Sequence, residues 1–363
     1  MRGALLINIA VVITLSVVAL DSASAHPAWG IVVDRNNQIY FSDIETIWKI
    51  DAQGKLTVFR PGVSGTHVHE ITLGEDGNIY GVENGYEPST QRFSAALWKV
   101  TPDGQSSYIL PTTFNPPKGM TNWKDRAGNS YYVGKRDNAS RDIFVLKRSP
   151  DGKVVTLAGN KKEGDEYRQV ALYSLGGMAF GSDGALYFTA NSSVGKLTPD
   201  GAMTLLASNL EIEDRAESPM PDSHLTPLFG IAVDSQGTSF VADYGNRRIL
   251  KIAPDGKSTT LMREEKPWSP TGVAFKDGNL YVLEFGFTLP STYIPRVRKL
   301  SADGTITTLA TIDANSTPVV SQNTSGATSE RPRFRRAYLL LAGLGILALT
   351  IVIWRSRRSD LRQ

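Results

Sequence analysis

The hydrophobic pattern is clearest between Leu228 and Met262, where four short apolar runs alternate with polar turns. The runs are GIAVD, TSFVAD, RILKIA and STTLM, and they are rich in Val, Ile, Thr and aromatic residues. Glycine occupies two of the turns, at Gly237 and Gly256. This pattern predicts a four-stranded antiparallel meander. Such a sheet cannot bury both faces alone, so we expect copies of it to stack side by side.

Both glycine turns recur along the chain. The second turn carries Gly54, Gly104, Gly152, Gly201, Gly256 and Gly304, at steps of 50, 48, 49, 55 and 48 residues. The first turn recurs as RNNQ (35–38), EDGN (75–78), RAGN (126–129), SDGA (182–185), SQGT (235–238) and KDGN (276–279). A period of about 50 residues with four strands per unit predicts a six-bladed β-propeller, an all-β fold. The predicted blades cover residues 28–60, 66–110, 117–158, 175–208, 228–262 and 270–310.

The long insertions all fall on one face of the predicted disc. In each blade they follow the second or the fourth strand, at 87–96, 111–118, 135–142, 159–175, 209–227 and 286–296. We call this side the looped face and the opposite side, with its glycine turns, the turn face. Variable loops on a rigid scaffold commonly carry a binding site, although this face can also simply tolerate insertions. The first blade begins at its own innermost strand and the last ends at its outermost, so we expect the ring to close without an exchanged strand.

Both ends of the chain carry features of export and anchoring. Arg2, an apolar run and Ala23-Ser24-Ala25 predict a signal peptide, the alternative being an uncleaved anchor helix. Ala337 to Trp354 holds 18 residues without a charge, about 27 Å as a helix, and predicts a transmembrane span. The predicted segments are 1–25 (signal peptide), 26–312 (propeller), 313–336 (flexible stalk), 337–354 (transmembrane helix) and 355–363 (cytoplasmic tail).

Charge and cysteine content narrow the location and the partners. Residues 26–330 hold 30 Lys+Arg and 34 Asp+Glu, a net charge of about −4, which argues against nucleic-acid binding. The chain has no cysteine, which favours a bacterial envelope protein over a disulfide-bonded secreted one. We therefore expect a single-pass membrane protein with its propeller on the extracytoplasmic side, periplasmic or extracellular. We also expect its looped face to point away from the membrane.

The stretch GIAVDSQGTSFVADYGNRRILKIAPDG (230–256) resembles the NHL-repeat consensus. The run LAGNKKEGDEYRQVALYSLGGMAF (157–180) is similar to the longer linker between NHL blades, and VGKLTPDG (194–201) to streptogramin lyase-like propellers. The wider group includes the regucalcin/gluconolactonase-like propellers. The resemblance covers roughly residues 28–310 and implies the fold more specifically than any activity.

The resemblance to gluconolactonase-like enzymes implies a divalent metal on the axis, held by Glu, Asn and Asp. Asp243 matches the family's Asp, and Glu70 precedes the innermost strand of blade 2. Trp29-Gly30 and Thr271 depart from the pattern, because they stand where the relatives carry Glu and Asn. Carboxylates converging on an axis suit Ca²⁺. The candidate metal ligands are Glu70, Asp243 and Glu284.

The segment THVHE (66–70) is the densest cluster of candidate chemistry. In an extended strand His67 and His69 share one side and Glu70 points to the other. Two histidines and a carboxylate can bind a metal or act as acid and base, the alternative being a pair of loop histidines. The candidate catalytic residues are His67, His69, Glu83 and Glu284, and the candidate ligand-binding residues are Glu70, Asn84, Lys135 and Asn191. Asp243 and Arg247 are expected to form a structural pair.

We therefore expect a membrane-anchored NHL-type propeller that binds a small molecule or an envelope protein on its looped face. The alternative is a metal-dependent hydrolase, lactonase or lyase of the gluconolactonase-like or streptogramin lyase-like kind. The sequence leaves open whether the protein is an enzyme.

Overall fold

The computed structural model describes residues 27–117, 120–135, 143–159, 162–163, 166–167, 175–190, 192–219, 228–288 and 292–312. The chain divides into two compact units, Met1–Gln322 and Asn323–Gln363, and all the described residues belong to the first. In this part of the chain no helix is both long and apolar enough to cross a bilayer. The predicted signal peptide, stalk and transmembrane segment lie outside the described residues.

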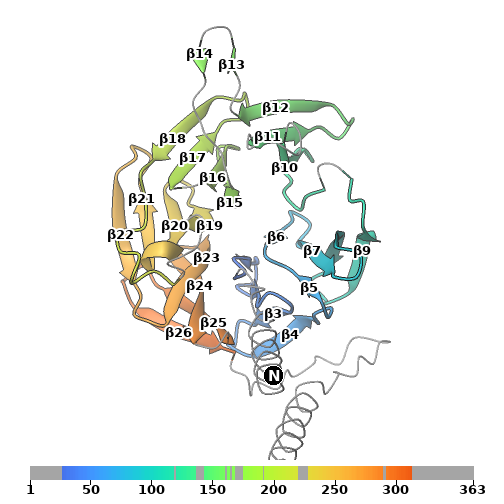
Figure 1. The fold of residues 1–363 in the computed structure, drawn as a ribbon. Helices are drawn as coiled ribbons and strands as arrows, with labels where there is room; N and C mark the ends of the chain where they lie inside the picture. The colour runs from blue at the N-terminus through green and yellow to red at the C-terminus, as the bar shows by residue number, and fades with distance from the viewer. Residues whose placement is uncertain are drawn as a thin grey trace, which may run out of the picture. The chain divides into compact units, whose positions relative to one another are not determined.

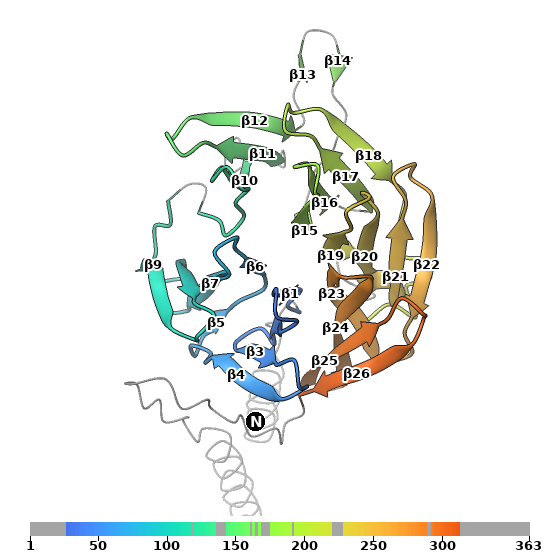
Figure 2. The same ribbon diagram turned by 180° about the vertical axis from the view of Figure 1, so that it is seen from behind.

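The described residues form six antiparallel blades arranged as a ring (Figures 1 and 2). Blade 1 contains β1 (Ile31–Val33), β2 (Ile39–Ser42), β3 (Ile47–Ile50) and β4 (Leu56–Arg60). Blade 2 contains β5 (Thr66–His67), β6 (Ile71–Leu73), β7 (Ile79–Glu87), β8 (Arg92–Val100) and β9 (Ser106–Thr113). Blade 3 contains β10 (Ser130–Lys135), β11 (Ile143–Arg148) and β12 (Val154–Gly159).

The second half of the ring is more regular. Blade 4 contains β15 (Leu175–Phe180), β16 (Leu186–Ala190), β17 (Ser193–Leu197) and β18 (Met203–Ala207). Blade 5 contains β19 (Leu228–Val233), β20 (Ser239–Asp243), the 3₁₀ turn η1 (Tyr244–Asn246), β21 (Arg248–Ile252) and β22 (Ser258–Arg263). Blade 6 contains β23 (Trp268–Lys276), β24 (Asn279–Thr288), β25 (Thr292–Leu300) and β26 (Ile306–Thr311). Between blades 3 and 4, β13 (Lys162–Glu163) pairs with β14 (Glu166–Tyr167).

The prediction of a six-bladed all-β propeller is confirmed, but two blades depart from the expected four strands. Blade 2 has five, because its β7–β8 hairpin is long enough for β5 to pair beyond β6. In blade 3 the described residues form three strands, with only an isolated bridge, Lys124 to Ser130, at the inner position. There the Thr121 hydroxyl accepts the Trp123 backbone N–H, a local turn that competes with strand pairing.

The prediction that no strand is exchanged between the chain ends is also confirmed for the described residues. Blade 1 is built from β1 to β4 and blade 6 from β23 to β26. Phe41 and Trp48 of blade 1 share one apolar cluster with Leu283 of blade 6. The ring therefore closes by side-chain packing.

Hydrophobic clusters of this kind fill five of the six blade boundaries. They lie between blades 6 and 1, 1 and 2, 3 and 4, 4 and 5, and 5 and 6. Among the described residues, no such cluster joins blades 2 and 3, and we call this boundary the seam. The described contacts across it are polar: Thr72 Oγ1 donates to the Asn122 carbonyl at 2.9 Å, and Arg126 pairs with Glu75 at 2.9 Å.

At other boundaries the innermost strands of neighbouring blades approach one another at glycines. A Cβ at Gly177 would lie 2.9 Å from the Cα of Gly230, and one at Gly230 would lie 2.8 Å from the Cα of Gly272. A Cβ at Gly30 would lie 2.6 Å from the backbone nitrogen of Ile71. At these positions a side chain would collide with backbone, so the strands can pack this closely only because glycine is present.

We predict that Gly230→Ala lowers the free energy of unfolding by about 3 kcal/mol, because backbone must move to admit the methyl group. The matched control is Gly304→Ala. A Cβ added at Gly304 would have no neighbouring atom within 4 Å, so the methyl group meets open space. The φ of +86° there is left-handed, and the strain of placing alanine in it should cost only about 1 kcal/mol. Denaturant unfolding measures both. A loss at position 230 no larger than that at position 304 would contradict the close approach.

Candidate functional site

Glu70 lies where three blades meet near the axis. It precedes β6, and its carboxyl oxygens accept two indole N–H groups, from Trp29 at 3.0 Å and from Trp123 at 2.6 Å. Trp29 belongs to blade 1 and Trp123 to blade 3. Glu70 therefore links the two neighbouring blades, and its bond to Trp123 crosses the seam.

A row of aromatic rings extends from Glu70's own segment across the axis. The His67 and His69 rings lie 5.8 Å apart, and His69 stacks on Trp29 at 5.4 Å. Trp29 in turn contacts Phe229 of blade 5 at 5.6 Å, although blade 6 separates these two blades in the ring. The contact between the two histidine rings agrees with the expectation that they share one side of their segment. We call Trp29, His69, Glu70, Trp123 and Phe229 the axial cluster.

The surroundings of Glu70 shift the pKa of its carboxyl group. Burial raises the pKa of Glu70 to about 8, although the bonds from the two indoles lower it. The side chain nevertheless keeps some exposure to solvent. A carboxyl group that exchanges its proton near neutral pH is a feature found at binding and catalytic sites.

The candidate residue Glu83, in the middle of β7, belongs to a buried ion pair rather than to the axial cluster. Arg60 of β4 donates to it at 2.5 Å, and the two side chains are only 5% and 2% exposed. The Arg60 guanidinium also lies over the Trp98 ring, 4.5 Å from its centroid. This pair fastens blade 1 to blade 2.

Glu284, at the corresponding place in β24, is bound by two arginines of β25. Arg296 Nε lies 2.6 Å and Arg298 Nη2 2.7 Å from its carboxyl oxygens. Both arginines also pair with Glu264, and Arg296 lies over the Trp268 ring at 3.8 Å. Burial, followed by the charge of Glu284, raises the pKa of Glu264 to about 7. Glu284 is therefore held in an ion-pair cluster by arginines of the next strand, β25.

Asp243 ends β20 and is fully buried, as expected for a structural residue, but its partner differs from the prediction. Arg248, not Arg247, donates to it, at 2.6 Å. Arg247 instead donates to the backbone carbonyls of Glu217 and Trp268. Its φ of 52° turns it away from the sheet, because it follows the 3₁₀ turn η1.

The described residues do not form the metal site predicted from Glu70, Asp243 and Glu284. Among them, no group of three or more His, Asp or Glu side chains is placed to hold a metal ion. Asp243 and Glu284 are each satisfied by arginine, which leaves Glu70 as the one member of the set at the axis. We therefore derive no chemistry through a metal.

The other predicted ligand-binding residues are placed only in part. Asn84 is exposed and lies opposite His67 in the β5–β7 register. The backbone of Lys135 ends β10, and Asn191 lies outside the described residues.

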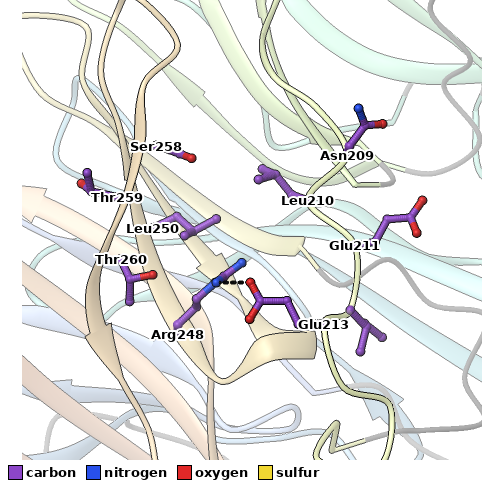
Figure 3. Close-up of a pocket in the computed structure, with 10 residues that line it drawn as sticks. Asn209, Leu210, Glu211, Glu213, Arg248, Leu250, Ser258, Thr259 and Thr260 are labelled. Carbon is purple, nitrogen blue, oxygen red and sulfur yellow. Dashed lines mark hydrogen bonds and ion pairs between the residues drawn. The ribbon is translucent and has the colours of Figure 1, made fainter.

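A separate groove of about 460 Å³ lies at the outer edge of blade 5 (Figure 3). Segment 209–213 forms one wall, and β21 and β22 form the other. Glu213 reaches across to Arg248 at 2.5 Å, and the Asn246 amide group donates to the Glu211 carbonyl. This part of the predicted 209–227 insertion therefore packs against blade 5.

The indoles of Trp29 and Trp123 were not among the candidate site residues predicted from the sequence. One signal was available: both precede the first inner segment of their blades, as Glu70 does. Arg60 and Glu264 gave no such signal, since Arg60 is far in sequence from Glu83, and Glu264 is far in sequence from Arg296 and Arg298.

Comparisons with known proteins return structures alone. No protein-family model matches the sequence, and no curated protein does. A streptogramin B lyase structure is 18% identical, with a TM-score of 0.44, over 79% of this chain and 84% of that one. The virginiamycin B lyase of Staphylococcus aureus, with selenomethionine, is 18% identical, with a TM-score of 0.41, over 78% and 83%. A gluconolactonase of Xanthomonas campestris is 15% identical, with a TM-score of 0.45, over 71% and 83%.

The chain is a six-bladed β-propeller similar to the streptogramin lyase and gluconolactonase propellers. The fold itself follows from the strand pairing described above. At these identities and TM-scores, no activity passes from these proteins to this one.

The pKa of Glu70 predicts a pH-dependent stability. Its value of about 8 in the folded protein exceeds the ordinary 4.5, so the folded state binds more protons between these values. Stability should therefore fall as pH rises from about 5 to about 9. In Glu70→Gln this slope should be shallower, as measured by thermal unfolding across the range. Glu87→Gln, an exposed change in the same blade, serves as control and should keep the wild-type slope. Equal slopes in all three proteins would argue against the raised pKa.

The Arg60–Glu83 pair predicts a large effect from removing one partner. Arg60→Met should cost about 3–5 kcal/mol, because it leaves a buried carboxylate without its cation. The control is Arg35→Met, which removes an exposed pair with Glu75 at 3.7 Å and should cost at most about 1 kcal/mol. Chemical denaturation compares the two. Similar losses would mean that the Glu83 carboxylate is solvated without Arg60.

Proposed function

We propose that this propeller binds a small-molecule ligand at the axial cluster on its looped face. The observation that carries the proposal is the Glu70 carboxyl group, held between indoles from two other blades and followed by aromatic rings across the axis. Glu70 supplies a hydrogen-bonding group that can be neutral or charged near pH 7, and the rings supply apolar contact. Such a combination of a few polar groups in an aromatic setting is typical of ligand sites.

We further propose that residues 337–354 tether the protein to a membrane and that the propeller is exported, periplasmic or extracellular. The support is the uncharged 18-residue run near the end and the signal-like first 25 residues. The absence of cysteine supports a bacterial envelope. A ligand of this site would then be met outside the cytoplasm.

The alternative is a hydrolase, lactonase or lyase. One observation favours it: a carboxyl group with a pKa of about 8 can give a proton to a leaving group, and His69 stacks on Trp29, the same indole that donates to Glu70. The described residues do not supply the metal set that such an enzyme of the gluconolactonase-like kind would need. The bond cleaved would have to be activated by Glu70 and the histidines alone.

We predict that Glu70→Gln weakens ligand binding about tenfold or more, because it removes a hydrogen-bonding partner that can carry charge. Trp29 and Trp123 report binding directly through indole fluorescence, so a panel of amines, lactones and esters can be screened without a label. Glu87→Gln is the matched control. A ligand that binds Glu70→Gln as tightly as the wild type would place the site elsewhere.

The same panel separates binding from catalysis. Turnover of a lactone or ester that is lost in Glu70→Gln, and that persists after chelation of metals, would favour the alternative. Binding without turnover would favour the leading proposal. If no small molecule alters the fluorescence while an envelope protein is retained by the wild type and not by Glu70→Gln, the ligand of this face is a protein.

A further inference from the structure

Exposed aromatic side chains gather on blade 2. Tyr86 and Phe93 face each other across the β7–β8 hairpin, with ring centroids 4.8 Å apart, and they are 48% and 72% exposed. Arg92, next to Phe93 in the chain, lies over the ring of Phe114 at 5.0 Å, and this ring is 42% exposed. We call Tyr86, Phe93 and Phe114 the hairpin patch. An exposed apolar cluster of this kind commonly marks a contact surface.

The hairpin that carries Tyr86 and Phe93 is longer than the sheet requires. β7 and β8 have nine residues each, whereas β2 and β3 of blade 1 have four each. The additional residues continue beyond Glu83 and Ala96, and most of them are exposed. Because the second strand of a blade ends on the looped face, the tip of the hairpin projects from that face.

The chain also leaves the propeller on the looped face. β26 is the fourth strand of its blade, so it runs from the turn face to the looped face. The last described residue, Ile312, donates its backbone N–H to the Pro295 carbonyl at 2.9 Å, in the part of β25 that pairs beyond Glu284. The predicted stalk, 313–336, therefore begins on the same face as the hairpin patch.

The length of that stalk limits how far the propeller can be from the bilayer. Any chain of 24 residues, the number in that segment, reaches at most about 80 Å, and a chain of this length that forms a flexible coil averages about 27 Å. A surface on the looped face is thus held close to lipid by its own tether. The opposite face is farther from the point of attachment.

We propose that the hairpin patch inserts into the interface of the lipid bilayer, so that the propeller rests on the membrane by blade 2 with its looped face toward it. This proposal rests on the tether in the proposed function. Aromatic rings favour the boundary between headgroups and acyl chains. The charges beside the patch, Glu87 and Arg92, cancel, so uncharged lipid suffices and added salt should have little effect. The orientation is opposite to the one expected from the sequence.

The absence of cysteine allows a clean test. In the full chain, Phe93→Cys is labelled with an environment-sensitive fluorophore, and the protein is reconstituted in phosphatidylcholine vesicles. Gln53→Cys, in an exposed turn on the turn face of blade 1, is the control, and Tyr86→Cys is a second patch position in case the first variant misfolds. Some of the lipid carries a nitroxide quencher on its acyl chain, and iodide serves as a quencher from the aqueous side. Flotation reports whether the protein is bound to vesicles.

The proposal expects at least twofold stronger nitroxide quenching at position 93 or 86 than at position 53, with iodide affecting mainly position 53. Flotation with iodide quenching at all positions would overturn the docking and leave the tether intact. A position 93 shielded from both quenchers would mean that protein, a partner or a second copy, covers the patch, which also overturns lipid docking. If the chain does not float with the vesicles, the tether and the docking both fail.

Discussion

The close approach of the innermost strands is the constraint on which the ring depends. Gly177, Gly230 and Gly272 let three successive strands meet backbone to backbone, and Gly30 does the same against the strand of blade 2. Because glycine has no Cβ atom, the innermost strands can pack this closely, and their first residues lie near the axis of the ring. The residues that precede them, including Trp29, Phe229 and Glu70, are therefore brought within contact distance of one another. The axial cluster is thus a consequence of how tightly the glycine positions pack, and its rings occupy the space where those strands begin.

The seam gives this centre its unusual chemistry. At the other five boundaries apolar side chains join the blades, but between blades 2 and 3 the described contacts are polar and lie close to the inner strands. Glu70 is one of them, through its 2.6 Å bond to Trp123. A carboxyl group that both holds a boundary and titrates near neutral pH couples the packing of the ring to the state of the site. A ligand that displaces an indole from Glu70 also breaks a bond between blades. Binding and the strength of this boundary are therefore linked by the same group.

Much of the fold could be predicted from the sequence, because each blade repeats its turns at a nearly fixed spacing and the turns carry glycine at left-handed positions, such as Gly256 with a φ of +86°. The exceptions arose where local chemistry competes with pairing, as at Thr121 in blade 3. The site was harder. THVHE drew attention to the right segment, but the sequence did not show that arginines pair with Glu83 and Glu284, and it assigned Asp243 to Arg247 rather than to Arg248. Those partners come from β4, β21 and β25, at sequence distances that follow no repeat. A buried carboxylate pairs with whichever cation the folded chain brings close to it. The repeat period of the sequence does not indicate which residue that is.

In a ring made from one chain, the junction of the two ends is the expected weak point, because no covalent bond crosses it. Here that junction, between blades 6 and 1, is filled by an apolar cluster and also held by Lys276, which donates to the Asp34 carbonyl at 2.6 Å. The least apolar boundary lies instead where the backbone runs on from blade 2 to blade 3. The continuous backbone thus strengthens the boundary between blades 2 and 3, whereas side-chain packing strengthens the one between blades 6 and 1. Under mechanical load, or in a circularly permuted chain cut between these two blades, the disc would part at the seam rather than where its natural ends meet.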